Sequence, residues 1–133
     1  MKLALTLAAA VLPLFAVAGP VVTRTNVNGC KPLGCYTDSV SYRALDINTQ
    51  VPGGPSGQSP ETCTAACIAH DLAFAGVEFG GECWCGAFIN NGHPLASNQA
   101  LCSTPCRGAP GEICGGADAI NVYDCTAALP APV

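Results

Sequence analysis

The chain has 133 residues, of which half are hydrophobic and only 11% are charged, and its formal net charge is −4. This acidic balance argues against a protein that binds nucleic acid or docks on anionic membranes, because both partners need a positive surface. Ten cysteines in so short a chain are typical of a small protein held together by disulfides.

Residues 1–18 have the pattern of a secretory signal peptide. Lys2 precedes an apolar run that ends in Ala16-Val17-Ala18, and this run is too short for a stable membrane anchor. Without Lys2, four Lys and Arg remain against nine Asp and Glu, which gives the mature chain a net charge of −5. We therefore expect a secreted, extracellular protein with no membrane anchor, whose cysteines form disulfides in an oxidising compartment rather than a zinc site.

The remaining length supports one domain. We expect a flexible N-terminal lead-in at residues 19–31, a folded domain at 32–125 and a flexible tail at 126–133. Residues 50–59 and 90–97 are rich in turn-forming Gly, Pro, Asn and Ser, and so predict two loops. A core of this size is modest without crosslinks, so the disulfides should carry part of the stability.

Residues 60–69 are predicted to form a helix. Ser59 can cap the free amide groups, Pro60 suits the first helical position, and Glu61 complements the positive end of the helix dipole. Because Cys63 and Cys67 are four residues apart, both thiols should point from one face of this helix.

The sequence around Gly80-Gly81 predicts a β-hairpin made of residues 74–79 and 82–87. A two-residue turn at these glycines places Val77 opposite Trp84. Val77 and Trp84 should then lie on one face of the hairpin, together with Phe79.

On the other face of this hairpin, Cys83 and Cys85 should point the same way. In the same register Gly76 lies opposite Cys85 and leaves room for the helix to approach. Two thiols on the helix then face two on the strand, which predicts the parallel pairs Cys63–Cys83 and Cys67–Cys85. The crossed alternative, Cys63–Cys85, stays open.

The pairing of the other six cysteines is predicted from their positions in the chain. Cys106 and Cys114 flank a compact loop that a bridge can close, and the remaining pairs are Cys35–Cys102 and Cys30–Cys125, of which the last ties the two ends together. Further short strands are expected at 33–37 and 119–124. The prediction is a small disulfide-rich α+β fold, a twisted antiparallel sheet with one or two helices.

Several short motifs occur in an order that resembles one known family. They are GCYTD at 34–38, TC at 62–63, AGVEFG at 75–80, ECWCG at 82–86, PC at 105–106, EICGG at 112–116 and NVY at 121–123. Together they resemble a WSC domain over about residues 33–124. The resemblance implies a PAN/apple-like fold, the same bridges from helix to hairpin, and a module that binds carbohydrate. Its usual eight cysteines match Cys35 through Cys114, so Cys30 and Cys125 lie outside that set.

WSC domains of fungal cell-wall sensors are followed by a Ser/Thr-rich stalk, a membrane helix and a cytoplasmic tail. No such segments follow in this sequence. We therefore expect a free-standing member, released or retained at the cell wall, rather than a signalling receptor.

Aromatic residues are the first candidates for glycan contact. Trp84 lies between two bridged cysteines, so its indole could stack on a sugar ring, or it could form core with Val77 and Phe79. Tyr36, Tyr42 and Tyr123 combine a ring with a hydroxyl and could line a groove, although each alone is more often a core residue with its hydroxyl bonded.

Polar residues are the second set of candidates. Asp38, Arg43, Asp46 and Asn121 offer donors and acceptors for sugar hydroxyls, and their alternative role is in turns or on a solvated surface. The predicted function is a secreted, non-catalytic carbohydrate-binding module for a cell-wall polysaccharide such as β-glucan or chitin, with no cofactor and no metal.

Two alternatives remain. A small glycan-active enzyme needs two carboxylates about 5 to 9 Å apart across a cleft, and the expected register puts Glu78 and Glu82 on opposite hairpin faces. His70 and His93 fit no triad or metal-ligand spacing, and bridged cysteines leave no thiol nucleophile. A secreted protein-interaction or effector-type module, acting on surface proteins, is the alternative that the sequence does not separate from glycan binding.

Overall fold

The computed structural model describes residues 26–131, so the expected signal peptide and most of the expected lead-in lie outside the described residues. Within this range the chain forms one α-helix, seven strands and three short 3-10 helices. The elements are β1 (Lys31–Thr37), β2 (Ile47–Thr49), η1 (Gly54–Gly57), α1 (Pro60–Ala69), β3 (Phe74–Glu78), β4 (Glu82–Gly86), η2 (Gln99–Leu101), β5 (Pro105–Cys106), β6 (Ala109–Ile113), β7 (Ala119–Asp124) and η3 (Thr126–Ala128).

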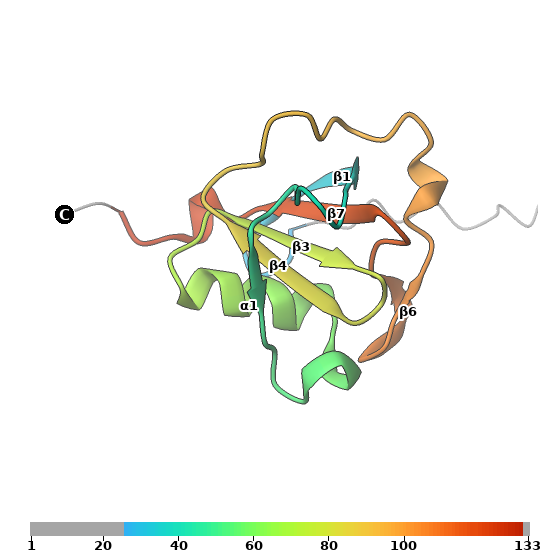
Figure 1. Ribbon diagram of the computed structural model, residues 1–133. Helices are drawn as coiled ribbons and strands as arrows, with labels where there is room; N and C mark the ends of the chain where they lie inside the picture. Colours follow the sequence, from blue (N-terminus) through green and yellow to red (C-terminus); the bar gives the residue numbers. More distant parts are fainter. Residues whose placement is uncertain (1–25, 132–133) are drawn as a thin grey trace, which may run out of the picture.

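Five strands form one antiparallel sheet in the order β1-β7-β3-β4-β2, and β5 and β6 form a separate small ribbon. Helix α1 lies along one face of the large sheet (Figure 1). The segment 38–46 and the long loop after β4 cover the opposite face, where Leu45 and Ile89 join a second core cluster. The small disulfide-rich α+β fold predicted from the sequence is confirmed, with a single α-helix in the described chain.

The start of α1 follows the predicted pattern. The Ser59 hydroxyl accepts a hydrogen bond from the Thr62 amide at 3.1 Å, and the Ser59 amide donates to the Thr62 hydroxyl at 2.9 Å. These two bonds form a capping box, with Pro60 at the first helical position. The helix therefore begins where its free amide groups find partners, and its buried face carries Cys63 and Cys67.

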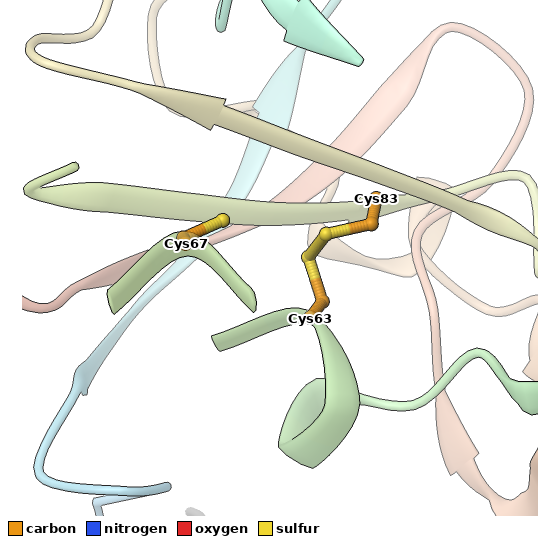
Figure 2. A group of neighbouring side chains, drawn as sticks. All are labelled: Cys63, Cys67 and Cys83. Atoms are coloured by element: carbon orange, nitrogen blue, oxygen red, sulfur yellow. A yellow bond between two sulfur atoms is a disulfide. The ribbon is translucent and has the colours of Figure 1, made fainter. Parts of the chain in front are cut away.

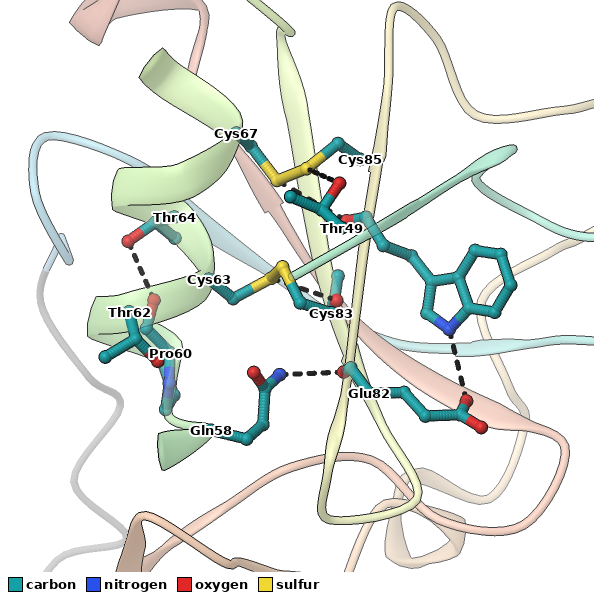
Figure 3. Close-up of a disulfide and its surroundings, with 12 residues drawn as sticks. Thr49, Gln58, Pro60, Thr62, Cys63, Thr64, Cys67, Glu82, Cys83 and Cys85 are labelled. Carbon is teal, nitrogen blue, oxygen red and sulfur yellow. Dashed lines mark hydrogen bonds between the residues drawn. A yellow bond between two sulfur atoms is a disulfide. The ribbon is translucent and has the colours of Figure 1, made fainter. Parts of the chain in front are cut away.

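All ten cysteines are bridged, in the pairs Cys30–Cys125, Cys35–Cys102, Cys63–Cys83, Cys67–Cys85 and Cys106–Cys114. These are the pairs predicted from the sequence, and the crossed alternative does not occur. The two bridges from α1 to β4 join Cα atoms 5.4 and 5.5 Å apart (Figure 3). They fasten the helix to the sheet at two successive turns.

The hairpin register differs from the predicted one. Its turn contains three residues, because Phe79 adopts a left-handed conformation with φ 51° before Gly80 at φ 76°. Glu78 therefore pairs with Glu82, and Val77 with Cys83. The expected pairing of Val77 with Trp84 is wrong.

Contacts outside the hairpin explain this longer turn. The Gly80 amide donates to the Cys114 carbonyl at 3.0 Å, and the Gly80 carbonyl accepts from the Arg107 amide at 3.0 Å. These bonds tie the hairpin tip to the β5–β6 ribbon. A register set by such distant partners is not visible in local sequence.

The one-residue shift moves each β3 side chain to the opposite face of the hairpin from the one predicted, relative to the side chains of β4. Gly76 lies opposite Trp84, on the face away from the helix, so the expectation that it makes room for the helix is wrong. A Cβ atom at Gly76 would clash with Ile120 and Leu45 instead. This glycine is needed for the packing of segment 38–46 on the sheet.

Two main core clusters occupy the two faces of the sheet. The cluster on the helix side is built mostly from half-cystines, with Val77 and Tyr123 among them. The cluster on the other side is aliphatic and contains Leu45, Ile120 and Val122, with the partly buried Trp84 packed against it. Most of the crosslinks therefore stabilise one side of the sheet.

The described ends of the chain are packed against each other. Val27 and Cys30 exchange two backbone hydrogen bonds, and Val27 is buried. The expectation of a flexible lead-in is therefore wrong for residues 26–31, which the Cys30–Cys125 bridge and the start of β1 hold in place. No helix within residues 26–131 is long and apolar enough to cross a membrane.

Candidate functional site

Trp84 projects from β4 on the face opposite the two disulfides of Cys83 and Cys85. Part of its ring packs against the aliphatic cluster around Leu45, and the residue remains partly exposed. The indole thus contributes to the core, but with Leu45 rather than with Val77 and Phe79, and it also reaches the surface. Its stacking on a sugar ring stays a prediction. Its backbone is fixed from both sides by bridged neighbours.

Arg43 lies over the ring of this indole. Its guanidinium carbon lies 4.4 Å from the centroid of the Trp84 ring, which is the geometry of a cation–π contact. The same guanidinium donates from Nη1 to Asp38 Oδ2 at 2.8 Å and contacts Glu78 Oε2 at 3.4 Å. Arg43 therefore connects an aromatic surface with two acidic side chains.

Asp38 holds the segment that carries Arg43. Its Oδ1 accepts a hydrogen bond from the Ala44 amide at 2.7 Å, and its Oδ2 binds Arg43. Burial alone would raise the pKa of Asp38, but hydrogen bonds from Glu78, Ala44 and Arg43 hold it below the ordinary value. Asp38 is therefore ionised at neutral pH and balances the charge of Arg43.

Glu78 is the most unusual ionisable group of the described chain. Only 3% of this residue is exposed, and burial, reinforced by the neighbouring Asp38, raises its pKa to about 9 despite the charge of Arg43. At neutral pH Glu78 therefore carries a proton. No N–H or O–H group among the described residues donates to its Oε1 atom.

Glu82 fixes the edge of the indole. Its Oε2 accepts a hydrogen bond from Trp84 Nε1 at 3.1 Å, and its backbone carbonyl accepts from the buried Gln58 side chain at 2.7 Å (Figure 3). Gln58 comes from the turn before α1, so the helix side also positions Glu82. We call the set Asp38, Arg43, Glu78, Glu82 and Trp84 the Arg43 cluster.

A shallow pocket of about 200 Å³ opens beside the Arg43 cluster at the tip of the β3–β4 hairpin. We call it the hairpin pocket. It is lined by Val40, Arg43, Glu78, Phe79, Glu82, Ala117 and Asp118. Enclosed sites for drug-sized ligands are usually about 300 to 1,000 Å³, so this pocket is smaller than a typical small-molecule site.

Three of the eight candidate binding residues named from the sequence meet in this cluster, namely Asp38, Arg43 and Trp84. Tyr36 packs its ring, partly buried, on the aliphatic core beneath. Tyr42 is exposed, and its ring packs against His93 of the long loop in a tilted arrangement, with the ring centroids 5.1 Å apart.

The remaining polar and aromatic candidates have structural contacts. Tyr123 is only 7% exposed and packs among the half-cystines, so its interpretation as a groove residue is wrong. Asn121 accepts a hydrogen bond from the Gly115 amide at 2.8 Å, and Asp46 accepts one from Asn90 at 2.6 Å. Both side chains hold loops in place.

Sequence reasoning missed Glu78, Glu82 and Phe79 as site residues. The assumed two-residue turn separated the two glutamates and placed Phe79 in the core, whereas the actual turn puts both glutamates on one face and leaves Phe79 exposed. A raised pKa beside other carboxyls is typical of functional sites. Here Arg43 Nη1 contacts Glu78 Oε2 at 3.4 Å, and Trp84 Nε1 occupies one oxygen of Glu82.

Three cysteines on the helix side lie as close together as the ligands of a metal ion. The sulfur atoms of Cys63, Cys67 and Cys83 lie within 4.8 Å of one another (Figure 2). Metal ligation requires thiolates, and in this structure all three sulfurs are in disulfides. The group is therefore a structural crosslink.

Comparison with protein families gives a direct result. The model of the WSC domain matches residues 32–116. The chain belongs to the WSC domain family. The matched stretch contains the Arg43 cluster and most of the hairpin pocket, whose remaining wall is formed by Ala117 and Asp118.

Individual relatives carry this WSC domain within larger proteins. A WSC domain-containing protein of Arthroderma benhamiae is 37% identical over 83% of this chain and 12% of its own length. Xylosyltransferase oxt of Drosophila melanogaster is 35% identical over 69% of this chain and 10% of its own. Human Kremen protein 2 is 33% identical over 69% of this chain and 19% of its own. The chain thus spans a fifth or less of each of these relatives.

Proposed function

We propose that this WSC domain is a secreted, non-catalytic module that binds a cell-wall polysaccharide, such as β-glucan or chitin, at the hairpin pocket and the adjoining Arg43 cluster. The observation that carries the proposal is the Arg43 cluster itself. It joins an aromatic surface, a guanidinium and acidic groups on a strand that two disulfides hold rigid. These groups match the apolar faces and the hydroxyls of a pyranose.

The geometry also predicts the strength of binding. Because the pocket is preformed, little conformational entropy is lost on binding. Because it is shallow and small, it offers few contacts per sugar unit. We therefore expect weak binding to a single oligosaccharide and measurable retention on an insoluble polymer, where many units are available.

The test is retention of the mature domain on a panel of insoluble polysaccharides. Trp84→Phe, which keeps an aromatic ring but removes the bond to Glu82, and Trp84→Ala should weaken retention at least about fivefold. Phe88→Ala is the matched control, since Phe88 is 61% exposed and follows the opposite end of β4. Equal weakening by the Phe88 variant, or hydrolysis of the polymer, would contradict the proposal.

A second function has one observation in its favour. Val40, Tyr42 and Phe79 expose large apolar side chains near the Arg43 cluster, as surfaces for protein partners often do. If a folded sample is retained on no polysaccharide, binding to an extracellular surface protein becomes the better proposal.

A further inference from the structure

The hairpin pocket has an unusual aromatic residue at its edge. Phe79 is 55% exposed although its backbone adopts the left-handed conformation, with φ 51°. A bulky side chain is disfavoured in this conformation by about 1 to 2 kcal/mol. Asp118, on the same pocket, is also left-handed at φ 49°. An exposed ring buries little apolar surface, so it does little to offset this strain.

The charges of the pocket do not balance. The positive Arg43 pairs at 2.8 Å with the negative Asp38, and Glu78 is neutral at ordinary pH because burial raises its pKa to about 9. Glu82 and Asp118 therefore leave the pocket with an excess of negative charge. Among its lining residues, Arg43 is the single cation.

The buried carboxyl of Glu78 belongs to the wall of this pocket. Glu78 forms part of the pocket lining, is almost fully buried, and its Oε1 receives no hydrogen bond from the described residues. Buried polar atoms are nearly always paired. The protonated Glu78 carboxyl is hydrogen-bonded to the neighbouring Asp38, so the two carboxyls carry one negative charge between them.

We propose that the hairpin pocket takes a pyranose that carries a protonated amino group, as in a deacetylated chitin chain, with Phe79 against the sugar ring and Glu82 and Asp118 facing the ammonium group. This inference rests on the proposed glycan-binding function and specifies its ligand. An N-acetyl group removes the positive charge, and a neutral glucan has none. The pocket therefore prefers the free amine over both.

The first experiment compares three tetrasaccharides, namely the β-linked glucosamine oligomer, its fully N-acetylated form and a neutral β-glucan oligomer. Binding to the mature domain is followed by NMR titration at a pH below the pKa of the sugar amine. We expect the glucosamine oligomer to bind at least about fivefold more tightly, the effect of one favourable ion pair.

Matched variants separate a specific site from general attraction between an acidic protein and a cation. Asp118→Asn removes one charge from the pocket, and Asp71→Asn removes one near the end of α1. Both residues are exposed and left-handed, with φ 49° and 55°, a conformation that Asn tolerates, so both variants should fold. Only Asp118→Asn should remove most of the preference for the amine. Phe79→Asn should weaken binding of all three oligomers.

The outcomes are distinct. Binding of the neutral oligomers without preference for the amine would overturn the amino-sugar inference and leave glycan binding intact. An equal loss in the Asp118 and Asp71 variants would assign the preference to overall charge and would also overturn it. Absence of binding to all three oligomers and to insoluble polysaccharides would refute both proposals.

Discussion

The two faces of the central sheet are held by different chemistry. On the helix side, two disulfides fix α1 to β4, and half-cystines make up most of the core. On the other side, segment 38–46 is held without a crosslink by a small aliphatic cluster and by the contacts of Arg43 with Asp38 and Glu78. The disulfides make the first face rigid, and the second face, held by non-covalent contacts, carries the groups that we propose to bind a ligand.

The largest effect should come from the face with the helix disulfides. Removing both helix bridges, with serine at Cys63, Cys67, Cys83 and Cys85, releases loops with sequence separations of 20 and 18. Each such bridge contributes about 3 kcal/mol to the free energy of unfolding, so the variant should be unfolded in a circular dichroism melt. Metal chelators should leave the melting temperature of the native protein unchanged. A chelator-induced loss of structure would contradict the disulfide assignment.

A methyl group added at Gly76 should destabilise the packing on the other face of the sheet. Gly76→Ala places a Cβ against Ile120 and Leu45, and such overpacking costs about 1 to 3 kcal/mol. Gly111→Ala is the control, because no atom lies within 4 Å of the added Cβ. Urea titrations of both variants measure the difference. A neutral Gly76→Ala would mean that the face is packed more loosely than the structure shows.

The helix and the hairpin differ in how far the sequence could predict them. The helix, the bridges and the fold class follow from local signals such as Ser59-Pro60 and the cysteine spacings. The register of the hairpin depends on hydrogen bonds from Gly80 to Cys114 and Arg107, which are distant in the chain. Because side chains alternate along a strand, this error of one residue moved Glu78 to the wrong face.

The candidate site was therefore predicted in part. Asp38, Arg43 and Trp84 could be chosen for their chemistry, but no sequence pattern indicates that Arg43 lies over Trp84. The burial of Tyr123 among the cysteines likewise depends on the position of β7 in the middle of the sheet. Tertiary contacts decide both points.

The pH dependence of the free energy of unfolding reports on Glu78, which lies on the face without the helix disulfides. Its pKa rises from 4.5 to about 9 on folding, so between these values the folded state binds more protons than the unfolded state. Stability from this group is full below pH 4.5 and is lost as the pH rises toward 9, with a slope of at most about 1.4 kcal/mol per pH unit.

Glu78→Gln, which is always neutral, should remove this slope. The variant should be more stable than the native protein at pH 8, by about 1 kcal/mol or more, and the difference should shrink toward pH 5. Thermal melts across this range measure it. Asp71→Asn, at an exposed carboxyl, should show no such trend. Parallel pH profiles for native protein and Glu78→Gln would show that Glu78 is ionised in the folded state.

The smallest effect should be a gain in stability at the hairpin tip. Phe79→Asn keeps a side chain that tolerates φ 51° and removes an exposed ring, so the free energy of unfolding should rise by about 0.5 to 1 kcal/mol. Phe88→Asn is the control, because Phe88 is also an exposed phenylalanine but its φ is not positive, and no gain is expected there. If Phe79→Asn lowers stability instead, the ring stabilises the fold and its left-handed backbone needs no functional explanation. If it raises stability and weakens glycan retention together, the tip of the hairpin trades stability for binding, while the bridges on the opposite face supply the rigidity that permits this trade.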